Sequence, residues 1–167
     1  MLTEADKTIR KSLLREEWKQ LVRVRGGQTI LLVEDDSDMR ELLASALRRD
    51  GYTVIEAADG DDALEWLGLG TLEGEPRRWP ALLVSDIRLP FFSGLDILEG
   101  LSLAMKRVPV VMITGFGDAE THARALGLGA TCVLDKPFDL IDFRYAVRAA
   151  LRAQSGPPHA HGDGHVL

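Results

Sequence analysis

The sequence is poor in features that would point to secreted, membrane or redox proteins. It has one cysteine, Cys132, which cannot form an internal disulfide, and its place in an apolar run indicates a small buried side chain rather than a reactive thiol. No stretch approaches the roughly 18 consecutive apolar residues that a membrane-spanning helix needs. The first residues are charged, unlike the basic and then apolar start of a secretory signal. These absences predict a cytoplasmic protein with no membrane partner.

A basic module of the kind that binds nucleic acid is also missing. The net charge is −6, and the two parts of the chain differ in sign. Residues 1–27 carry more Lys and Arg than Asp and Glu, whereas residues 28–167 carry a clear excess of Asp and Glu. Because an acidic domain repels phosphates, the sequence predicts protein partners and no direct contact with nucleic acid.

Short apolar runs alternate with stretches of helical periodicity from residue 29 onward. Since the predicted strands are apolar almost throughout, both faces of their sheet must be covered by helices. The pattern predicts an α/β fold with a five-stranded, doubly wound parallel sheet. Asp36, Asp59 and Asp118 stand where helix N-caps are expected. The predicted strands are 30–33, 53–57, 81–84, 108–113 and 131–134, and the predicted helices are 39–47, 63–67, 95–101, 119–126 and 140–151.

The segment 1–27 precedes these units and is predicted to form an amphipathic N-terminal helix or linker. Its apolar side chains recur on one helical face, and this face is too apolar to stay in contact with water on so short a helix. Because the sheet already has cover on both faces, the helix is expected to pair two chains into a homodimer rather than fold back. The residues of this face are Leu14, Trp18, Leu21 and Val22.

Two further segments fall outside the five units. Residues 68–80 are rich in Gly, Pro and charge, and are predicted to form a surface loop whose end is held by Trp79. Residues 153–167 cannot bury much apolar surface and are predicted to be a disordered tail. The folded domain is therefore predicted over residues 28–152.

Acidic, hydroxyl and amino side chains follow the predicted strands at their carboxyl ends. In a doubly wound sheet these ends share one edge, where ligands bind in the crevice at the strand-order switch. Residues far apart in the sequence are therefore expected to converge there. They are Glu34 and Asp35 after the first strand, Asp86 after the third, Thr114 after the fourth and Lys136 after the fifth.

Converging carboxylates repel one another, so one of them would keep a proton unless a cation lies among them. An open site of oxygen ligands favours Mg²⁺ over a calcium cage. Phosphoryl transfer needs an in-line nucleophile and neutralisation of charge on the transferred oxygens. Asp86 can be the nucleophile and form an acyl phosphate, while Lys136 supplies an ammonium and Thr114 a hydroxyl. Each residue alone also fits a structural role, and only their combination predicts a magnesium-dependent phosphoacceptor.

With these residues, the sequence resembles the receiver domains of two-component response regulators over about residues 28–152. The resemblance implies a (βα)5 flavodoxin-like fold and a phosphoryl group accepted on Asp86 from a histidine kinase or phosphotransfer protein. It also implies a downstream protein effector, and a regulator rather than an enzyme, catalysing only its own phosphorylation and dephosphorylation. The matching segments are 30–36 ending in Glu34-Asp35-Asp36, Ser85-Asp86 with Pro90 and Gly94, Ile113-Thr114-Gly115, and Lys136-Pro137-Phe138.

The family resemblance also assigns roles around the acceptor. Asp35 and Asp86 would contact Mg²⁺ directly, and Glu34 would act through water. The backbone carbonyl of Arg88 would be the remaining protein ligand. The peptide bond before Pro137 is typically cis in the family, an isomer that is energetically accessible for proline.

One position departs from the family pattern. Three residues before the lysine, many receivers carry a Tyr or Phe that swings inward when the threonine is drawn to the phosphate, and here the residue is Val133. Phosphorylation is therefore expected to shift the population of the two conformations less than in other receivers, unless the Phe116 side chain supplies the missing volume. Movement of Thr114 and the loop after it is still expected to reshape one output surface. That surface comprises residues 118–126, 131–136 and 140–151.

Other functions share part of this chemistry. A magnesium-dependent phosphohydrolase of the haloacid-dehalogenase type carries a second Asp two residues after its nucleophile, where this sequence has Arg88. A purely structural pseudo-receiver would not need Thr114 and Lys136. Within the receiver interpretation, the lack of an output module after residue 151 favours a single-domain regulator over the receiver portion of a hybrid kinase or a multidomain regulator.

Overall fold

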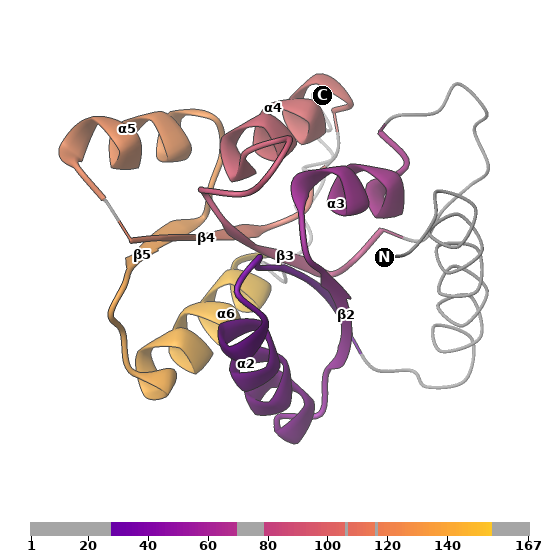
Figure 1. Ribbon diagram of the computed structural model, residues 1–167, viewed down its shortest axis with the longest axis vertical. Helices are drawn as coiled ribbons and strands as arrows, with labels where there is room; N and C mark the ends of the chain where they lie inside the picture. The colour runs from indigo at the N-terminus through magenta and orange to yellow at the C-terminus, as the bar shows by residue number, and fades with distance from the viewer. Residues whose placement is uncertain (1–27, 70–78, 106, 116, 155–167) are drawn as a thin grey trace, which may run out of the picture.

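The computed structural model describes residues 28–69, 79–105, 107–115 and 117–154, which form one parallel sheet with helices on both faces (Figure 1). The strand order β2-β1-β3-β4-β5 is that of the flavodoxin-like fold, so the predicted architecture is confirmed. The strands are β1 (Thr29–Val33), β2 (Thr53–Ala57), β3 (Leu82–Asp86), β4 (Val110–Thr114) and β5 (Cys132–Asp135). The helices are α2 (Ser37–Arg49), α3 (Gly60–Leu67), α4 (Gly94–Leu103), α5 (Ala119–Gly127) and α6 (Leu140–Gln154).

Several sequence predictions lie outside the described residues. These are the N-terminal helix with its apolar face, the homodimer that it was expected to form, most of the 68–80 loop, and the tail from residue 155 onward. Trp79, at the end of that loop, is described and packs against the core layer on the α3 and α4 side, as predicted.

The two faces of the sheet are covered by different helices: α2 and α6 on one side, and α3, α4 and α5 on the other (Figure 1). Alternate residues of each central strand enter the two layers. In β1, Ile30 and Leu32 join the layer under α2 and α6, whereas Leu31 and Val33 join the opposite layer. Successive side chains of a strand therefore point to opposite faces of the sheet. Because both faces are buried, the side chains on both faces are apolar.

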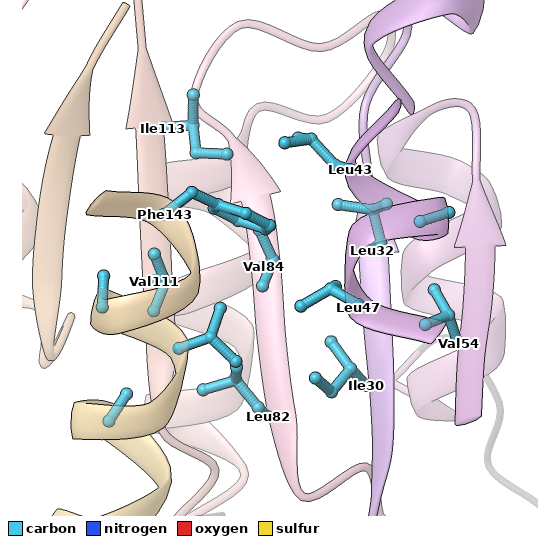
Figure 2. Packing of buried hydrophobic residues seen from close by; sticks show 14 of the residues in the cluster. Ile30, Leu32, Leu43, Leu47, Val54, Leu82, Val84, Val111, Ile113 and Phe143 are labelled. Carbon is cyan, nitrogen blue, oxygen red and sulfur yellow. The ribbon is translucent and has the colours of Figure 1, made fainter. Parts of the chain in front are cut away.

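Phe143 of α6 is fully buried and anchors the first of these layers. Figure 2 shows its ring reaching the sheet beside Val84 and Val111, which lie on neighbouring strands. The ring also stacks on Phe138, with the two ring centroids 5.8 Å apart. This contact holds α6 close to the loop that follows β5.

The predicted N-caps are confirmed on three helices. The side chains of Asp36, Asp59 and Asp118 accept a hydrogen bond from the backbone N–H three residues further on, at 2.8, 2.7 and 2.7 Å. These aspartates satisfy N–H groups that the first helical turn leaves unpaired. In α4, Ser93 and Asp96 form a reciprocal capping box that the sequence analysis did not single out. Each cap fixes the point where a helix begins after a strand-end loop.

Most predicted boundaries differ from the observed ones by one to three residues, and two of these differences have an identifiable cause. β4 begins at Val110 rather than 108, because Pro109 has no N–H to give to the sheet, although its carbonyl accepts from Leu83 N at 3.0 Å. Helix α6 continues past 151 to Gln154, so the first two residues assigned to the tail are helical. The Gln154 side chain donates to the carbonyl of Arg107 at 2.7 Å, a contact that holds this last turn.

In the described part of the chain, no helix combines the length and apolar character that a membrane span requires. The cytoplasmic location expected from the sequence stays a prediction.

Candidate functional site

Glu34 lies directly beyond the end of β1 and is almost fully buried, with 1% of its surface exposed. Its backbone N–H donates to the carbonyl of Ala57 at 3.1 Å, which continues the pairing of β1 with β2 by one residue. Its Oε1 accepts from the N–H of Asp36 at 3.2 Å. The next residue, Asp35, is exposed at the rim. The turn between β1 and α2 therefore presents one buried and one accessible carboxylate.

Asp86 ends β3 and is buried, with 5% of its surface exposed. Its Oδ1 accepts from the backbone N–H of Arg88 at 2.9 Å, so the start of the following loop orients the carboxylate. Gly94 is needed beside it, because a Cβ at that position would lie 2.3 Å from the backbone oxygen of Asp86. The chain can thus pack α4 directly against the strand end that carries this acid.

Lys136 lies just after β5 and links the two buried acids. Its Nζ lies 2.7 Å from Oδ2 of Asp86 and 3.0 Å from Oε2 of Glu34. Its backbone N–H donates to the carbonyl of Thr114 at 2.7 Å, which ties it to the end of β4. The peptide bond between Lys136 and Pro137 is cis, the isomer that the family resemblance implies. The ammonium therefore reaches across from the edge strand β5 to the acids of β1 and β3.

The three predicted acids come together at the point where the strand order switches between β1 and β3. One carboxylate oxygen from each of Glu34, Asp35 and Asp86 lies within 4.8 Å of the others. Burial raises the pKa of Glu34, with a further contribution from the charge of Asp86, while hydrogen bonding to Lys136 partly offsets this. Burial also opposes the charge of Lys136, but the hydrogen bonds to Asp86 and Glu34 outweigh it and raise the lysine pKa.

Thr114 is the last residue of β4 and is buried beside Lys136 in the sheet. The structure therefore places all five predicted site residues at one edge of the sheet, from four different strand ends. Val133 is half-buried and packs into the layer on the α3 to α5 side. Phe116, the other candidate for the switch, lies outside the described residues.

Two features of the site surroundings had no signal in the sequence. Arg40 of α2 donates from Nη1 to the backbone carbonyl of Glu34 at 2.8 Å. On the other side, His122 of α5 and Asp135 of β5 are joined by a hydrogen bond of 2.8 Å between Nε2 and Oδ1. Both pairs depend on how a helix packs on the sheet, which periodicity alone does not specify.

The charges and oxygen donors around Asp86 determine what chemistry the site can perform. A buried carboxylate at Asp86 has an ammonium in contact, and two further carboxylates face it across less than 5 Å. The cluster thus carries more negative than positive charge, and its oxygen donors are the ligands that hard divalent cations prefer. Phosphoryl transfer requires a nucleophile next to a site for a cation, and this cluster has that arrangement.

Comparisons with known proteins identify the family of this domain. A family model described as "Response regulator receiver domain" matches residues 30–148. Phosphate regulon transcriptional regulatory protein PhoB of Klebsiella pneumoniae is 37% identical over 128 residues, which make up 75% of this chain and 52% of that protein. Regulator of RpoS of Escherichia coli K12 is 40% identical over 126 residues, or 75% of this chain and 35% of that protein.

Among solved structures, the non-phosphorylated HemR receiver domain of Leptospira biflexa superimposes with a TM-score of 0.64 at 31% identity, covering 74% of this chain and 94% of that one. Since the chain spans about half the length of PhoB, the expected single-domain organisation stays a prediction. The match over residues 30–148 and the identity to these relatives show that this chain belongs to the response regulator receiver family.

Proposed function

We propose that Asp86 accepts a phosphoryl group from a histidine kinase or a phosphotransfer protein, and that the domain signals through changed protein contacts. The observation that carries this proposal is the 2.7 Å contact between the Asp86 carboxylate and the Lys136 ammonium inside a cluster of acids. The other acids, Glu34 and Asp35, flank the acceptor without sharing its place at the end of β3. The relatives named as transcriptional regulatory protein and as regulator support a signalling role.

In the proposed reaction, a carboxylate oxygen of Asp86 attacks the phosphorus of the donor. The new oxygen–phosphorus bond forms as the bond to the donor's leaving group breaks, which gives an acyl phosphate. Lys136, already hydrogen-bonded to Asp86, neutralises charge on the transferred oxygens, and the Thr114 hydroxyl donates to one of them. Turnover would be limited to the domain's own phosphorylation and dephosphorylation, with no separate substrate.

The acid cluster fits Mg²⁺. Asp35 and Asp86 would hold the ion directly, Glu34 through water, and the carbonyl of Arg88 would complete the protein ligands. When bound, the ion supplies positive charge that offsets repulsion between the carboxylates and the incoming phosphoryl oxygens. The exposed position of Asp35 suits exchange of the ion with solvent.

The acceptor is tested with a small phosphodonor such as acetyl phosphate and Mg²⁺, followed by intact-mass spectrometry. One phosphate should be added, it should be labile in base, and chelation of Mg²⁺ should prevent its addition. Asp86→Asn should abolish it, whereas Asp142→Asn, which changes an exposed acid in the first turn of α6, should leave it intact. A phosphate retained in Asp86→Asn would contradict the assignment.

We further propose that output passes through the surface made by α5, β5 and α6. The Thr114 hydroxyl would donate a hydrogen bond to a phosphoryl oxygen, a bond that exists only in the phosphorylated state, and the loop after Thr114 leads into α5. Val133 is too short to swing as an aromatic ring would, so the population shift should be modest.

This route is tested by amide hydrogen exchange with and without beryllofluoride, a phosphoryl mimic. Exchange should change mainly in α5, β5 and α6, and the change should diminish in Thr114→Ala. Changes confined to α2 and α3, or an undiminished response in Thr114→Ala, would show that the signal takes another path.

A further inference from the structure

Arg40 of α2 makes a contact that bears directly on the acid cluster, although it was not part of the predicted site. Its guanidinium Nη1 donates to the backbone carbonyl of Glu34 at 2.8 Å. Its Nε lies 3.7 Å from Oε1 of Glu56 on the edge strand β2, and only 21% of its side chain is exposed. One guanidinium thus bridges the turn after β1 and the neighbouring strand.

The carbonyl that Arg40 holds belongs to the peptide unit between Glu34 and Asp35, the two acids of the turn. Glu34 is fixed on its other side, because its N–H is bonded to Ala57 and its carboxylate to Lys136. Asp35 is exposed at the rim, and its direction depends on the orientation of this peptide plane. A rotation of the plane would move the Asp35 carboxylate away from Glu34 and Asp86, from which its oxygen now lies within 4.8 Å.

Arg40 is itself held in place. Glu56 accepts from Arg48 Nη2 at 2.9 Å, so the glutamate lies between two arginines of α2. The same Arg48 nitrogen donates to the carbonyl of Val54 at 3.2 Å. Because Glu56 balances part of the arginine charge, Arg40 brings a directed hydrogen bond to the turn without placing an unpaired cation beside a cation site.

We propose that Arg40 is a positioning residue for divalent-cation binding: it sets the Glu34–Asp35 peptide so that Asp35 faces the other two acids. This inference rests on the proposed function of the acid cluster. The inference also separates two effects of Arg40 on Mg²⁺ affinity, which have opposite signs. As a cation, Arg40 would weaken the binding of Mg²⁺ by repulsion, whereas as a positioning residue it strengthens binding.

The test compares three variants by isothermal titration with MgCl₂ in the absence of a phosphodonor. Arg40→Gln removes both the positive charge and the forked guanidinium group. Arg40→Lys keeps the charge, but its single amino group cannot bridge the Glu34 carbonyl and Glu56. Arg48→Gln is the matched control, because it makes the same charge change on the same helix, against the same glutamate, without touching Glu34. We expect both Arg40 variants to bind Mg²⁺ about tenfold more weakly, the loss that removal of an outer-shell partner typically causes.

Arg48→Gln should stay within about twofold of the native affinity, since it lacks the contact with the Glu34 carbonyl. Backbone amide resonances of Asp35 and Asp36 provide a second readout, because they should shift without metal in both Arg40 variants and not in Arg48→Gln. Unchanged or tighter binding in Arg40→Gln, or equal losses in Arg40→Gln and Arg48→Gln, would overturn the inference. If the native chain itself bound no Mg²⁺, the proposed function would fail instead, so the two failures are distinguishable.

Discussion

The centre of the sheet and its β5 edge are built very differently. Every residue of β3 and β4 is buried, whereas no residue of β5 is fully buried. The helices follow the same trend, since α6 buries five residues and α5 buries only Ala125. The proposed acceptor, Asp86, lies at the centre of the sheet, whereas the proposed output surface includes the thinly packed edge.

This difference suggests that the two regions of the domain have separate roles, one in phosphoryl transfer and the other in signalling. Phosphoryl transfer requires a nucleophile held in a fixed place, and the interior of the sheet provides this for Asp86 because close-packed side chains move little. A signalling surface instead needs alternative arrangements that differ little in free energy. An edge helix with one buried residue and a partly exposed hydrogen bond between His122 and Asp135 meets that need.

The same chemical change should have very different costs in the two regions. Leu47→Ala in α2 removes a fully buried side chain and should lower the free energy of unfolding by about 3 kcal/mol. Leu126→Ala in α5 removes a side chain that is 51% exposed, and the loss should be no more than about 0.5 kcal/mol. Urea unfolding followed by circular dichroism measures both. Similar losses in the two variants would show that α5 is packed as firmly as α2.

An ion pair on the well-packed side should give an intermediate effect. Asp50 caps α2 at its C-terminus, and its buried carboxylate is bound by Arg144 of α6, with Arg148 3.5 Å away. Asp50→Asn should therefore destabilise the domain at pH 7, less than Leu47→Ala and more than Leu126→Ala. The exposed arginine side chains weaken the pair through solvent screening.

The contribution of Asp50 should also depend on pH. Hydrogen bonding to Arg144 holds the pKa of Asp50 below its usual range. A lowered folded-state pKa gives stability that is fully present above the ordinary aspartate pKa of about 4 and is lost as the pH falls through the lowered value. The stability difference between native protein and Asp50→Asn should stay constant from pH 7 to about pH 5, then shrink. A difference that grows in acid would contradict the pairing.

The hydrogen bond between His122 and Asp135 on the β5 side should have little effect on the free energy of unfolding and a clearer effect on amide hydrogen exchange in α5. His122→Gln should change the free energy of unfolding by less than about 0.5 kcal/mol, since both side chains of the pair with Asp135 are partly exposed. Gly117→Ala would place a Cβ 1.9 Å from the Asp135 carboxylate oxygen and 2.4 Å from His122 Nε2, so it should separate the pair. Amide exchange in α5 should accelerate in both variants, whereas Mg²⁺-dependent phosphorylation of Asp86 should stay at the native rate.

The smallest effect concerns Cys132 at the start of β5. Burial raises the pKa of its thiol, so little thiolate forms near neutral pH. Alkylation by iodoacetamide at pH 7.5 should be much slower in the folded protein than in urea, and it should rise only at higher pH. A rate equal to that in urea would mean that the β5 edge opens more readily than its packing indicates.

Much of the fold followed from patterns that act over short stretches of chain. The apolar runs that became β1, β3 and β4 have the composition of strands buried on both faces, and Asp36, Asp59 and Asp118 could be assigned as caps from position alone. The segment limits were less secure. Pro109 is present in the sequence and could have marked the start of β4, whereas the end of α6 depends on a contact between Gln154 and the distant Arg107.

The sequence alone also determined where the proposed acceptor site lies, because parallel strands in a doubly wound sheet end at one edge and thereby bring Glu34, Asp86 and Lys136 together. Which side chains support that site depends on tertiary packing, which the sequence pattern does not reveal. The contact of Arg144 with Asp50 joins residues 94 positions apart, and that of His122 with Asp135 joins residues 13 apart. Such pairs depend on the angle and rotation at which each helix packs on the sheet. Local propensity and periodicity carry no information on that geometry, because it is set by the fit of all the core side chains at once.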